Sequence, residues 1–408
     1  MSSNFISKLK QSVSAAFEDL YAHQISTSEV KIETTNPSFA GSFTFVVFPY
    51  LRVTNSKPED CAAAIGSFIT SQLEEVNAFN VVKGFLNFEL TDAFWLSYLS
   101  HLQLSDRLGE TTPNPEKIMV EYSSPNTNKP LHLGHVRNNL LGYSISQILS
   151  YYGHEVVKAN LINDRGIHIC KSMLAYALFA NEETPTSGNI KGDHLVGKYY
   201  VTFDKAYKEE QSKLIEGGLS EEEAKGQSTL MADAREMLTK WENGDEATLA
   251  LWNKLNDWVY AGFDISYKRM GVDFDTYYKE SNTYLLGKEM VQEGLDNGAF
   301  FKKEDGSVWV DLTDDGLDQK LLLRADGTSV YMTQDIGTAD LKYNDYKMDK
   351  SIYVVGNEQE YHFKVLQLVL KKLGKPYAEG LIHMSYGMVE LPSGKLKTRE
   401  GKVVDADD

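Results

Sequence analysis

The chain has 408 residues, 42% of them hydrophobic and 24% charged, which is typical of a folded globular protein of about two domains. Its net charge of −17 argues against broad, nonspecific nucleic-acid binding, although a local basic patch can still hold a folded RNA. No apolar run reaches the roughly 18 residues of a membrane span, and residues 1–9 lack a signal core. We therefore expect a cytoplasmic protein with no membrane partner. Cys61 and Cys170 are too few for a disulfide framework or a structural zinc site.

The first hundred residues predict a small α+β domain. Apolar spacing and turn residues predict helices over residues 5–20, 58–73 and 94–102, strands over residues 28–32 and 41–53, and a hairpin over residues 79–90. No cluster of catalytic residue types occurs in this part. Phe45 and Asn87 lie in its strands and could either face a partner or pack inside. Two prolines in residues 111–115 indicate a linker.

Residues 120–138, VEYSSPNTNKPLHLGHVRN, combine a strand, a polar loop and the start of a helix. Turn-forming residues occupy positions 123–130, and a helical pattern follows. Its apolar residues recur at helical spacing, which predicts that they bury one face of the helix. These residues are Leu141, Ile145, Ile148 and Tyr152.

His132 and His135 are three residues apart at the start of this helix and should share a face. The first helical turn offers unpaired N–H groups and a partial positive charge, which suit phosphate, and imidazoles can donate to its oxygens. Gly134 leaves room for a phosphate or a flat ring. The pair could instead bind a metal or be capping residues satisfied locally. No third ligand at a helpful spacing supports the metal interpretation.

Four further polar residues surround the same strand end, where open parallel sheets bind their ligands. They supply a carboxylate, a hydroxyl, an amide and a cation. These residues are Glu121, Ser123, Asn126 and Lys129.

The string HLGH at residues 132–135 resembles the HIGH signature of class I aminoacyl-tRNA synthetases. The longer string EYSSPNTNKPLHLGH resembles the arginyl-tRNA synthetases in particular. The resemblance implies an α/β fold, with a Rossmann-like parallel-sheet catalytic domain over residues 113–408. It implies ATP-dependent activation of L-arginine, with Mg²⁺ bound to the substrate, and transfer to the 3′ end of tRNA(Arg). It also implies that residues 1–112 form an additional domain that contacts tRNA.

On this resemblance, His132, His135 and Lys129 are the catalytic groups that hold the phosphates and neutralise charge. Gly134 and Asn138 are assigned to the nucleotide site. No general base is required, because the arginine carboxylate that attacks the α-phosphorus is already ionised.

The next predicted strand covers residues 155–162 and ends in the turn residues 163–166. Similar segments line the active site in the family, and Asn163 or Asp164 could equally cap a helix. Residues 181–280 are charged, helical and poor in strand signals. They are similar to the insertion that class I synthetases carry between the two halves of the nucleotide-binding fold.

A later segment combines an aromatic side chain with a carboxylate. Strands are expected over residues 308–312 and 321–324, and a turn at Asp326-Gly327 leads into a strand over residues 328–332. Tyr331 would end that strand, and Asp335 would open a helix over residues 333–343. A guanidinium suits stacking and a carboxylate. Alternatively, Asp335 only interacts favourably with the helix dipole.

The strings RADGT and YMTQD resemble the substrate segment of the arginyl family, which implies that Tyr331 and Asp335 hold the guanidinium. The resemblance carries Glu121, Ser123 and Asn126 over to the same substrate pocket. Gln359, between a strand over residues 351–355 and a helix over residues 361–373, would complete it, or would be an amide satisfied locally. This assignment requires residues 120–138 and 331–335 to converge on one cavity.

A strand over residues 381–389 ends at Gly387 and Met388, where the family places adenine on the backbone. Residues 392–402, PSGKLKTREGK, are either a solvated charged loop or a variant of the second class I signature, KMSK. Thr398 replaces its second lysine, and Lys129 stands where such enzymes carry a compensating lysine. We assign Lys395, Lys397 and Arg399 to nucleotide binding without individual roles.

The family continues into a helical anticodon-binding domain, so the sequence predicts a monomeric chain truncated before that domain, and such a fragment could be inactive alone. One alternative is another class I synthetase. A cysteinyl enzyme would need a zinc site, and a glutamyl enzyme would need a cation in place of Asp335. The other alternative is a non-catalytic fragment that binds arginine or RNA.

Overall fold

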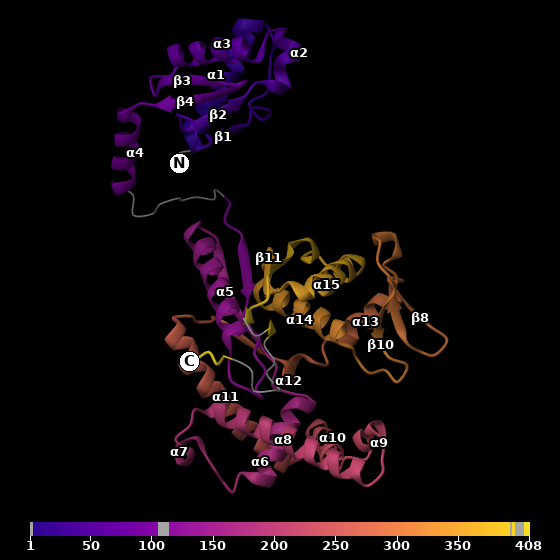
Figure 1. Cartoon of the computed structure of the whole chain (residues 1–408). Helices are drawn as coiled ribbons and strands as arrows, with labels where there is room; N and C mark the ends of the chain where they lie inside the picture. The colour runs from indigo at the N-terminus through magenta and orange to yellow at the C-terminus, as the bar shows by residue number, and fades with distance from the viewer. Residues whose placement is uncertain (1–2, 105–113, 392–393, 396–403) are drawn as a thin grey trace. The chain divides into compact units, whose positions relative to one another are not determined.

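A computed structural model describes residues 3–104, 114–391, 394–395 and 404–408 (Figure 1). The chain divides into two units, Met1–Glu110 and Thr111–Asp408, each of which is described here by itself. Among the described helices, none combines the length and the apolar character that crossing a membrane requires.

The first unit contains a four-stranded antiparallel sheet in the order β1-β2-β4-β3, against which α1 and α3 pack. Aromatic residues from these elements fill its core, including Phe17, Phe45 and Phe88. Its elements are α1 (Ser3–Tyr21), β1 (Ile32–Thr34), β2 (Phe43–Val46), η1 (Phe48–Tyr50), α2 (Leu51–Thr54), α3 (Pro58–Gln72), β3 (Val76–Val82), β4 (Phe85–Leu90) and α4 (Asp92–Leu104).

Two details of this unit correct or settle the sequence predictions. The strand expected over residues 41–53 ends at Val46 and is followed by helical turns, because Pro49 has no N–H for a sheet ladder. Phe45 and Asn87 pack inside, each only 1% exposed. Thr44 Oγ1 donates to Asn87 Oδ1 (2.6 Å), so this amide is satisfied within the sheet.

The second unit is built on a five-stranded parallel sheet in the order β12-β11-β5-β6-β7. The chain runs outward from β5 to β7, then returns to the other side of β5 through β11 and β12. The predicted Rossmann-like α/β fold is therefore confirmed. The carboxyl ends of β5 and β11 meet at the switch point, where such sheets bind ligands. The strands are β5 (Lys117–Glu121), β6 (Glu155–Ile162), β7 (Thr276–Lys279), β11 (Lys350–Gly356) and β12 (Leu381–Tyr386).

Helices and short turns connect these strands. They are α5 (Leu133–Tyr151), α6 (Ile167–Phe179), α12 (Glu280–Thr283), α13 (Gly287–Asp296), α14 (Tyr331–Tyr346), η3 (Asn357–Gln359), α15 (Glu360–Lys372) and η4 (Ala378–Gly380). A two-stranded ribbon, β13 (Glu390–Leu391) with β14 (Gly394–Lys395), follows β12.

The first crossover helix, α5, packs differently from the prediction. Leu141 and Ile148 are 37% and 66% exposed, and the buried residues of α5 are Asn138, Asn139, Gly142 and Ser146. A Cβ atom on Gly142 would lie 2.3 Å from Cγ of Tyr122, which follows β5. Small and amide side chains therefore face the sheet because the helix approaches β5 too closely for larger ones.

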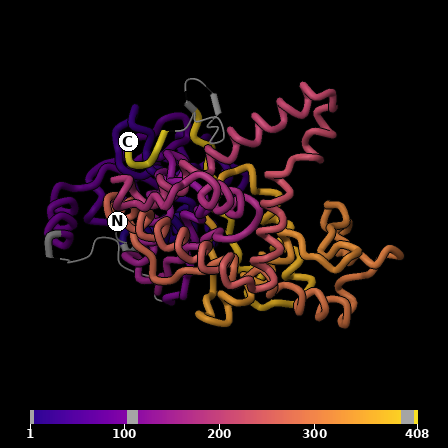
Figure 2. The backbone as a smooth tube through the Cα atoms, turned by 90° about the horizontal axis from the view of Figure 1, so that it is seen from below, coloured from indigo at the N-terminus to yellow at the C-terminus, as the bar shows by residue number. Residues whose placement is uncertain are grey.

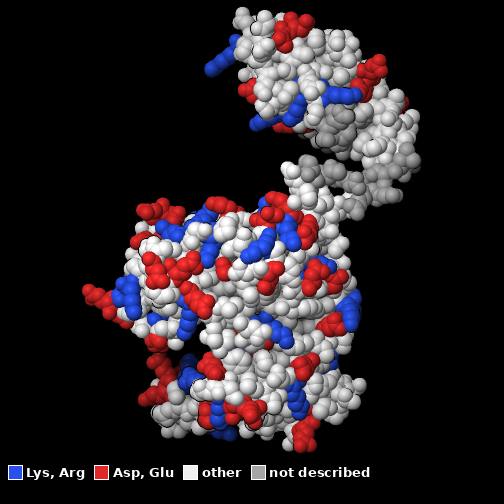
Figure 3. Space-filling view, turned by 180° about the vertical axis from the view of Figure 1, so that it is seen from behind, with Lys and Arg blue, Asp and Glu red and all other residues white. Residues whose placement is uncertain are grey.

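Five further helices lie between α6 and β7 (Figure 1). They are α7 (Pro185–Gly188), α8 (Gly192–Glu216), α9 (Glu221–Gly226), α10 (Thr229–Glu242) and α11 (Glu246–Met270). Three of them, α8, α10 and α11, share one apolar core with α6. Seen from below, the pink to red part of the tube projects from the body of this unit (Figure 2). On the face shown in Figure 3, acidic and basic side chains of this unit are interspersed.

A small antiparallel sheet precedes α14, with the strands β8 (Phe300–Lys302), β9 (Val308–Val310) and β10 (Lys320–Leu323), and η2 (Thr313–Asp315) between the last two. The turn at Asp326-Gly327 forms, but the strand expected after it is reduced to one bridge, Leu323 with Ser329. The helix begins at Tyr331, two residues earlier than predicted. The apolar residues Met332, Ile336 and Ala339 recur at helical spacing and are buried, which favours the helix.

Candidate active site

A pocket of about 220 Å³ lies at the carboxyl ends of β5 and β11, and we call it the Asp335 pocket. It combines two carboxylates, one ammonium group and an imidazole with apolar walls. Its lining residues are Glu121, Ser124, Leu161, Asn163, Asp335, Thr338, Lys342, Tyr353, Val355, Gln359, His362, Phe363 and Leu366.

Asp335 lies in the second turn of α14 rather than at its start, so the interpretation as a helix-opening residue is wrong. Its Oδ2 atom is 2.6 Å from Nε2 of His362, on α15. The two side chains remain 36% and 28% exposed, so the pair borders the open part of the pocket. The carboxylate predicted to bind a guanidinium is thus already paired with a group that can be cationic.

Glu121 and Lys342 form a buried ion pair on the inner side of this pocket. Their side chains are 6% and 1% exposed. Burial lowers the pKa of Lys342, but the charge and hydrogen bond of Glu121, together with the charges of Tyr353 and Asp335, outweigh it and the net pKa is raised, so the amine stays protonated. Glu121 is therefore paired with Lys342, a partner that the sequence analysis did not predict. The spacing could have indicated it, because Lys342 follows Asp335 by seven residues and so lies on the same face of the helix.

Of the other residues predicted to bind the amino acid, some line the Asp335 pocket and others do not. Gln359, in η3, lines the Asp335 pocket. Tyr331 is 80% exposed at the first position of α14 and is not among the lining residues. Asn126 pairs in a β-bridge with Asn163, and Asn163 does line the pocket.

Ser123 and Asn138 hold the site together instead of lining it. Asn138 Oδ1 accepts from the Ser123 N–H (2.5 Å), and its amide donates to the Val354 carbonyl (2.6 Å). The same amide donates to the Tyr386 hydroxyl (2.9 Å), so both of its protons are used. The Ser123 hydroxyl is bonded to Tyr267 on α11 (2.6 Å). These contacts connect the loop after β5 to β11, β12 and the insertion.

The turn after β6 likewise connects elements around the site. Gly166, with φ of 100°, is the N-cap of α6, so the expectation that Asn163 or Asp164 caps that helix is wrong. Asp164 is completely buried, and its carboxylate accepts from Ser281 (2.8 Å) and Tyr260 (3.0 Å).

His132 and His135 cap α5, and their ring centroids are 4.0 Å apart. Nδ1 of His132 accepts from the Gly134 N–H, and Nδ1 of His135 accepts from the His132 N–H, both at 3.1 Å. Burial, then nearby positive charge, lowers the pKa of both rings, that of His132 to about 4. Each neutral ring therefore carries its proton on Nε2. Two Nε2–H donors suit phosphate oxygens, whereas Nε2 coordination of a metal would require losing that proton.

The first turn of α5 does not offer free backbone donors, contrary to the prediction. The Leu133 N–H donates to the Val404 carbonyl (3.0 Å), and those of His135 and Val136 donate to the His132 carbonyl (2.7 and 3.1 Å). Space above Gly134 is filled as well, since a Cβ there would lie 2.9 Å from Cε1 of His132. Any anion bound here must therefore be held by side chains.

A second cavity, of about 210 Å³, opens between residues 129–132 and α8, and we call it the His132 cavity. Its polar lining includes the cations Lys129 and Lys198, the imidazoles of His132 and His194, and the carboxylate of Asp405. Stretch 120–138 thus lines both cavities, through Glu121 in one and His132 in the other. The predicted single cavity is two neighbouring ones.

The structure describes only some of the residues that were predicted to bind adenine or to form the second signature. The Gly387 carbonyl accepts from Arg137 (2.6 Å), a partner that the sequence did not reveal. Met388 is 50% exposed and lies over Gly356. Lys395 is described only as a strand residue, in β14. Lys397 and Arg399 lie outside the described residues.

Comparison with known families places this parallel-sheet unit among the class I aminoacyl-tRNA synthetases. Residues 98–408 match the family described as tRNA synthetases class I (R), catalytic domain. The chain belongs to the arginine–tRNA ligase family, whose members join arginine to tRNA.

Individual relatives agree with this assignment. The chain is 58% identical over 403 residues to the arginine–tRNA ligase of Bacteroides thetaiotaomicron, covering 98% of the chain and 68% of that protein. It is 55% identical over 407 residues to that of Porphyromonas gingivalis, covering 99% and 68%. The arginyl-tRNA synthetase of Thermus thermophilus shares the fold with a TM-score of 0.68 at 20% identity, covering 98% of the chain and 68% of that structure.

Proposed function

We propose that the Asp335 pocket binds L-arginine and that the His132 cavity, together with His135, binds the phosphates of ATP. The observation that carries this proposal is the charge of the Asp335 pocket. Glu121 is paired with the ammonium group of Lys342, whereas Asp335 is bonded to an imidazole through one oxygen only, which leaves its other oxygen for a guanidinium. Arginine's planar, permanently charged group suits such a site.

In this proposal, the arginine carboxylate attacks the α-phosphorus of ATP and pyrophosphate leaves. A hydroxyl at the 3′ end of tRNA(Arg) then attacks the carbonyl of the adenylate, takes the arginyl group, and AMP leaves. The Nε2–H groups of His132 and His135 donate to phosphate oxygens, and Lys129 neutralises charge on the leaving group. Both rings remain neutral donors at pH 7 because their pKa values are lowered. Mg²⁺ enters with the phosphates of the nucleotide.

The proposal also assigns roles to residues outside the Asp335 pocket. The unit Met1–Glu110 contacts tRNA, and the protein acts as a monomer in the cytoplasm. Adenine lies near Gly387 and Met388, and Lys395, Lys397 and Arg399 contribute positive charge to the nucleotide site. Light scattering of the purified protein tests the monomer, and tRNA binding after deletion of the first unit tests its role.

Calorimetry tests the substrate assignment. Arginine should bind, while citrulline, which has the same shape without the charge, should not bind measurably. Asp335→Asn should weaken arginine binding by about 2–5 kcal/mol, because it removes one partner of a charge pair that the bound arginine would desolvate. Asp326→Asn, in the exposed turn before α14, is the matched control. Equal affinities for arginine and citrulline would reject the proposed pocket.

A further inference from the structure

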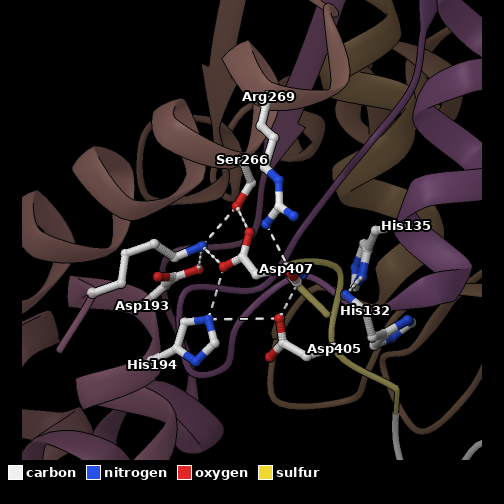
Figure 4. A network of polar contacts seen from close by, with 9 residues as sticks. His132, His135, Asp193, His194, Ser266, Arg269, Asp405 and Asp407 are labelled. Atoms are coloured by element: carbon white, nitrogen blue, oxygen red, sulfur yellow. Dashed lines mark hydrogen bonds and ion pairs between the residues drawn. The ribbon is translucent and has the colours of Figure 1, made fainter.

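Residues Val404–Asp408 lie antiparallel to the segment that carries His132. The Leu133 N–H donates to the Val404 carbonyl, and the Ala406 N–H donates to the Leu131 carbonyl, both at 3.0 Å. His132 and Asp405 face each other between these two bonds. The main chain on both sides of His132 is therefore held by this segment (Figure 4).

Asp407 anchors the segment to the helical insertion. Its carboxylate forms an ion pair with Lys191 and accepts from His194 Nε2 (2.9 Å) and from the Ser266 hydroxyl (3.0 Å). Its main-chain carbonyl accepts from Arg269 (2.6 Å). Partial burial raises the pKa of Asp407, but the hydrogen bonds from these donors outweigh it and lower the pKa to about 2. The carboxylate is thus ionised throughout the physiological range.

The partners of Asp407 are themselves fixed. Lys191 is the N-cap of α8 and also lies 3.2 Å from the carboxylate of Asp193, whose side chain is completely buried. A Cβ on Gly262 would lie 2.3 Å from Asp193 Oδ1, so α8 and α11 are in close contact here. Asp407 therefore binds to a rigid junction of two helices.

We propose that Asp407 is a positioning residue for the reaction. By fixing its segment to α8 and α11, it holds the main chain around His132, and so sets where the Nε2–H of that ring points. This inference rests on the proposed role of His132 in binding phosphate. Asp407 lies in the last residues of the chain, and no sequence pattern connects it with α8 or α11.

A cation site is the competing explanation of the same cluster. His194, Asp405 and Asp407 offer ligand atoms within 4.8 Å of one another. However, Lys191 and Ser266 already occupy the oxygens of Asp407. The carboxylate therefore has its positive partner within the protein, and the geometry points to an anchor.

Pyrophosphate exchange, measured with tRNA present, tests this inference through the variants Asp407→Asn and His132→Asn. Asp407→Asn should lower kcat about 10- to 100-fold, the loss expected when a catalytic group is displaced by about 1 Å. The KM for arginine should stay unchanged, since the Asp335 pocket shares no residue with this junction. Asp408→Asn, which removes the same charge from the exposed neighbouring residue, should retain full activity.

A double variant separates positioning from general stability. If Asp407 acts through His132, the double variant should lose no more activity than His132→Asn alone. Multiplied losses would overturn the inference. An unchanged rate in Asp407→Asn would do the same. An unchanged rate in His132→Asn would instead reject the proposed role of His132.

Hydrogen exchange provides a readout that does not need activity. In Asp407→Asn, the Leu133 and Ala406 amides should exchange at least about tenfold faster, because their acceptors are no longer held in place. Amides in the middle of α5 should not change. Equal protection in both proteins would contradict the inference. If Asp407→Asn does not fold, Ser266→Ala removes one donor to the same carboxylate and should give a smaller change in the same amides.

Discussion

The imidazole of His362 occupies the carboxylate that the arginine side chain is proposed to bind, with Nε2 lying 2.6 Å from Oδ2 of Asp335. The carboxylate that the proposal assigns to arginine therefore already has a hydrogen-bond partner within the protein. Lys342 and Glu121 line the same pocket.

His362 should compete with arginine for Asp335. Its Nε2 atom is bonded to the oxygen that the guanidinium is proposed to bind, so the guanidinium must displace the imidazole or use the other oxygen. Removing the imidazole should therefore strengthen arginine binding. Calorimetry measures the dissociation constant.

His362→Ala removes the competing hydrogen bond and should lower the dissociation constant for arginine several-fold. His101→Ala, at an exposed position of α4, is the control and should behave as the parent protein. An unchanged affinity in His362→Ala would show that His362 and arginine do not compete for Asp335. Loss of arginine binding in every variant would count against the pocket itself.

Lys342→Met should strongly destabilise the protein. It leaves the Glu121 carboxylate buried without a cation, and breaking such a pair typically costs about 3–5 kcal/mol. The free energy of unfolding in urea measures the loss. The double variant Glu121→Gln/Lys342→Met, which buries no charge, should recover much of the stability. A loss below about 1 kcal/mol would show that water reaches the pair, as in surface ion pairs.

The parallel sheet was implied by the family resemblance, and apolar segments bounded by turn residues located some of its strands. Residues 155–162 match β6, and residues 351–355 lie within β11. Apolar spacing predicted the wrong buried face for α5. A helix pressed against a sheet buries small residues such as Gly142, while Leu141 stays exposed.

The candidate site was only partly predictable, for a different reason. Residue type and spacing pointed to His132 and His135, because they start a helix beside a strand end, whereas the choice of Asp335 rested on the family resemblance. Partners far away in sequence could not be found this way. Ser123 bonds to Tyr267, 144 residues later, and no local pattern connects them.

Acid should destabilise the protein through the histidine cap. The pKa of His132 falls from 6.5 to about 4 on folding, because burial disfavours the charged ring. The unfolded chain then binds more protons between these values, so stability is full above about pH 6.5 and declines as the pH falls to about 4. The contribution is at most about 3 kcal/mol.

Urea unfolding at a series of pH values measures this effect. His132→Asn retains an N-cap acceptor without titrating, and should flatten the pH dependence in this window. His101→Asn should leave it unchanged. If His132→Asn keeps the full acid dependence of stability, the effect belongs to other groups, such as His135.

Gly142→Ala should destabilise the protein, although alanine is ordinarily the better helix former by about 1 kcal/mol. The new Cβ would lie 2.3 Å from Cγ of the fully buried Tyr122, so α5 must move away from β5. Overpacking of this kind costs about 1–3 kcal/mol. Gly226→Ala, in α9, is the matched control, because a Cβ there meets nothing within 4 Å. That substitution should be neutral or stabilising. Since α5 carries His132 at its start, Gly142→Ala should also slow pyrophosphate exchange, and a stable variant with full activity would show that α5 repacks without cost.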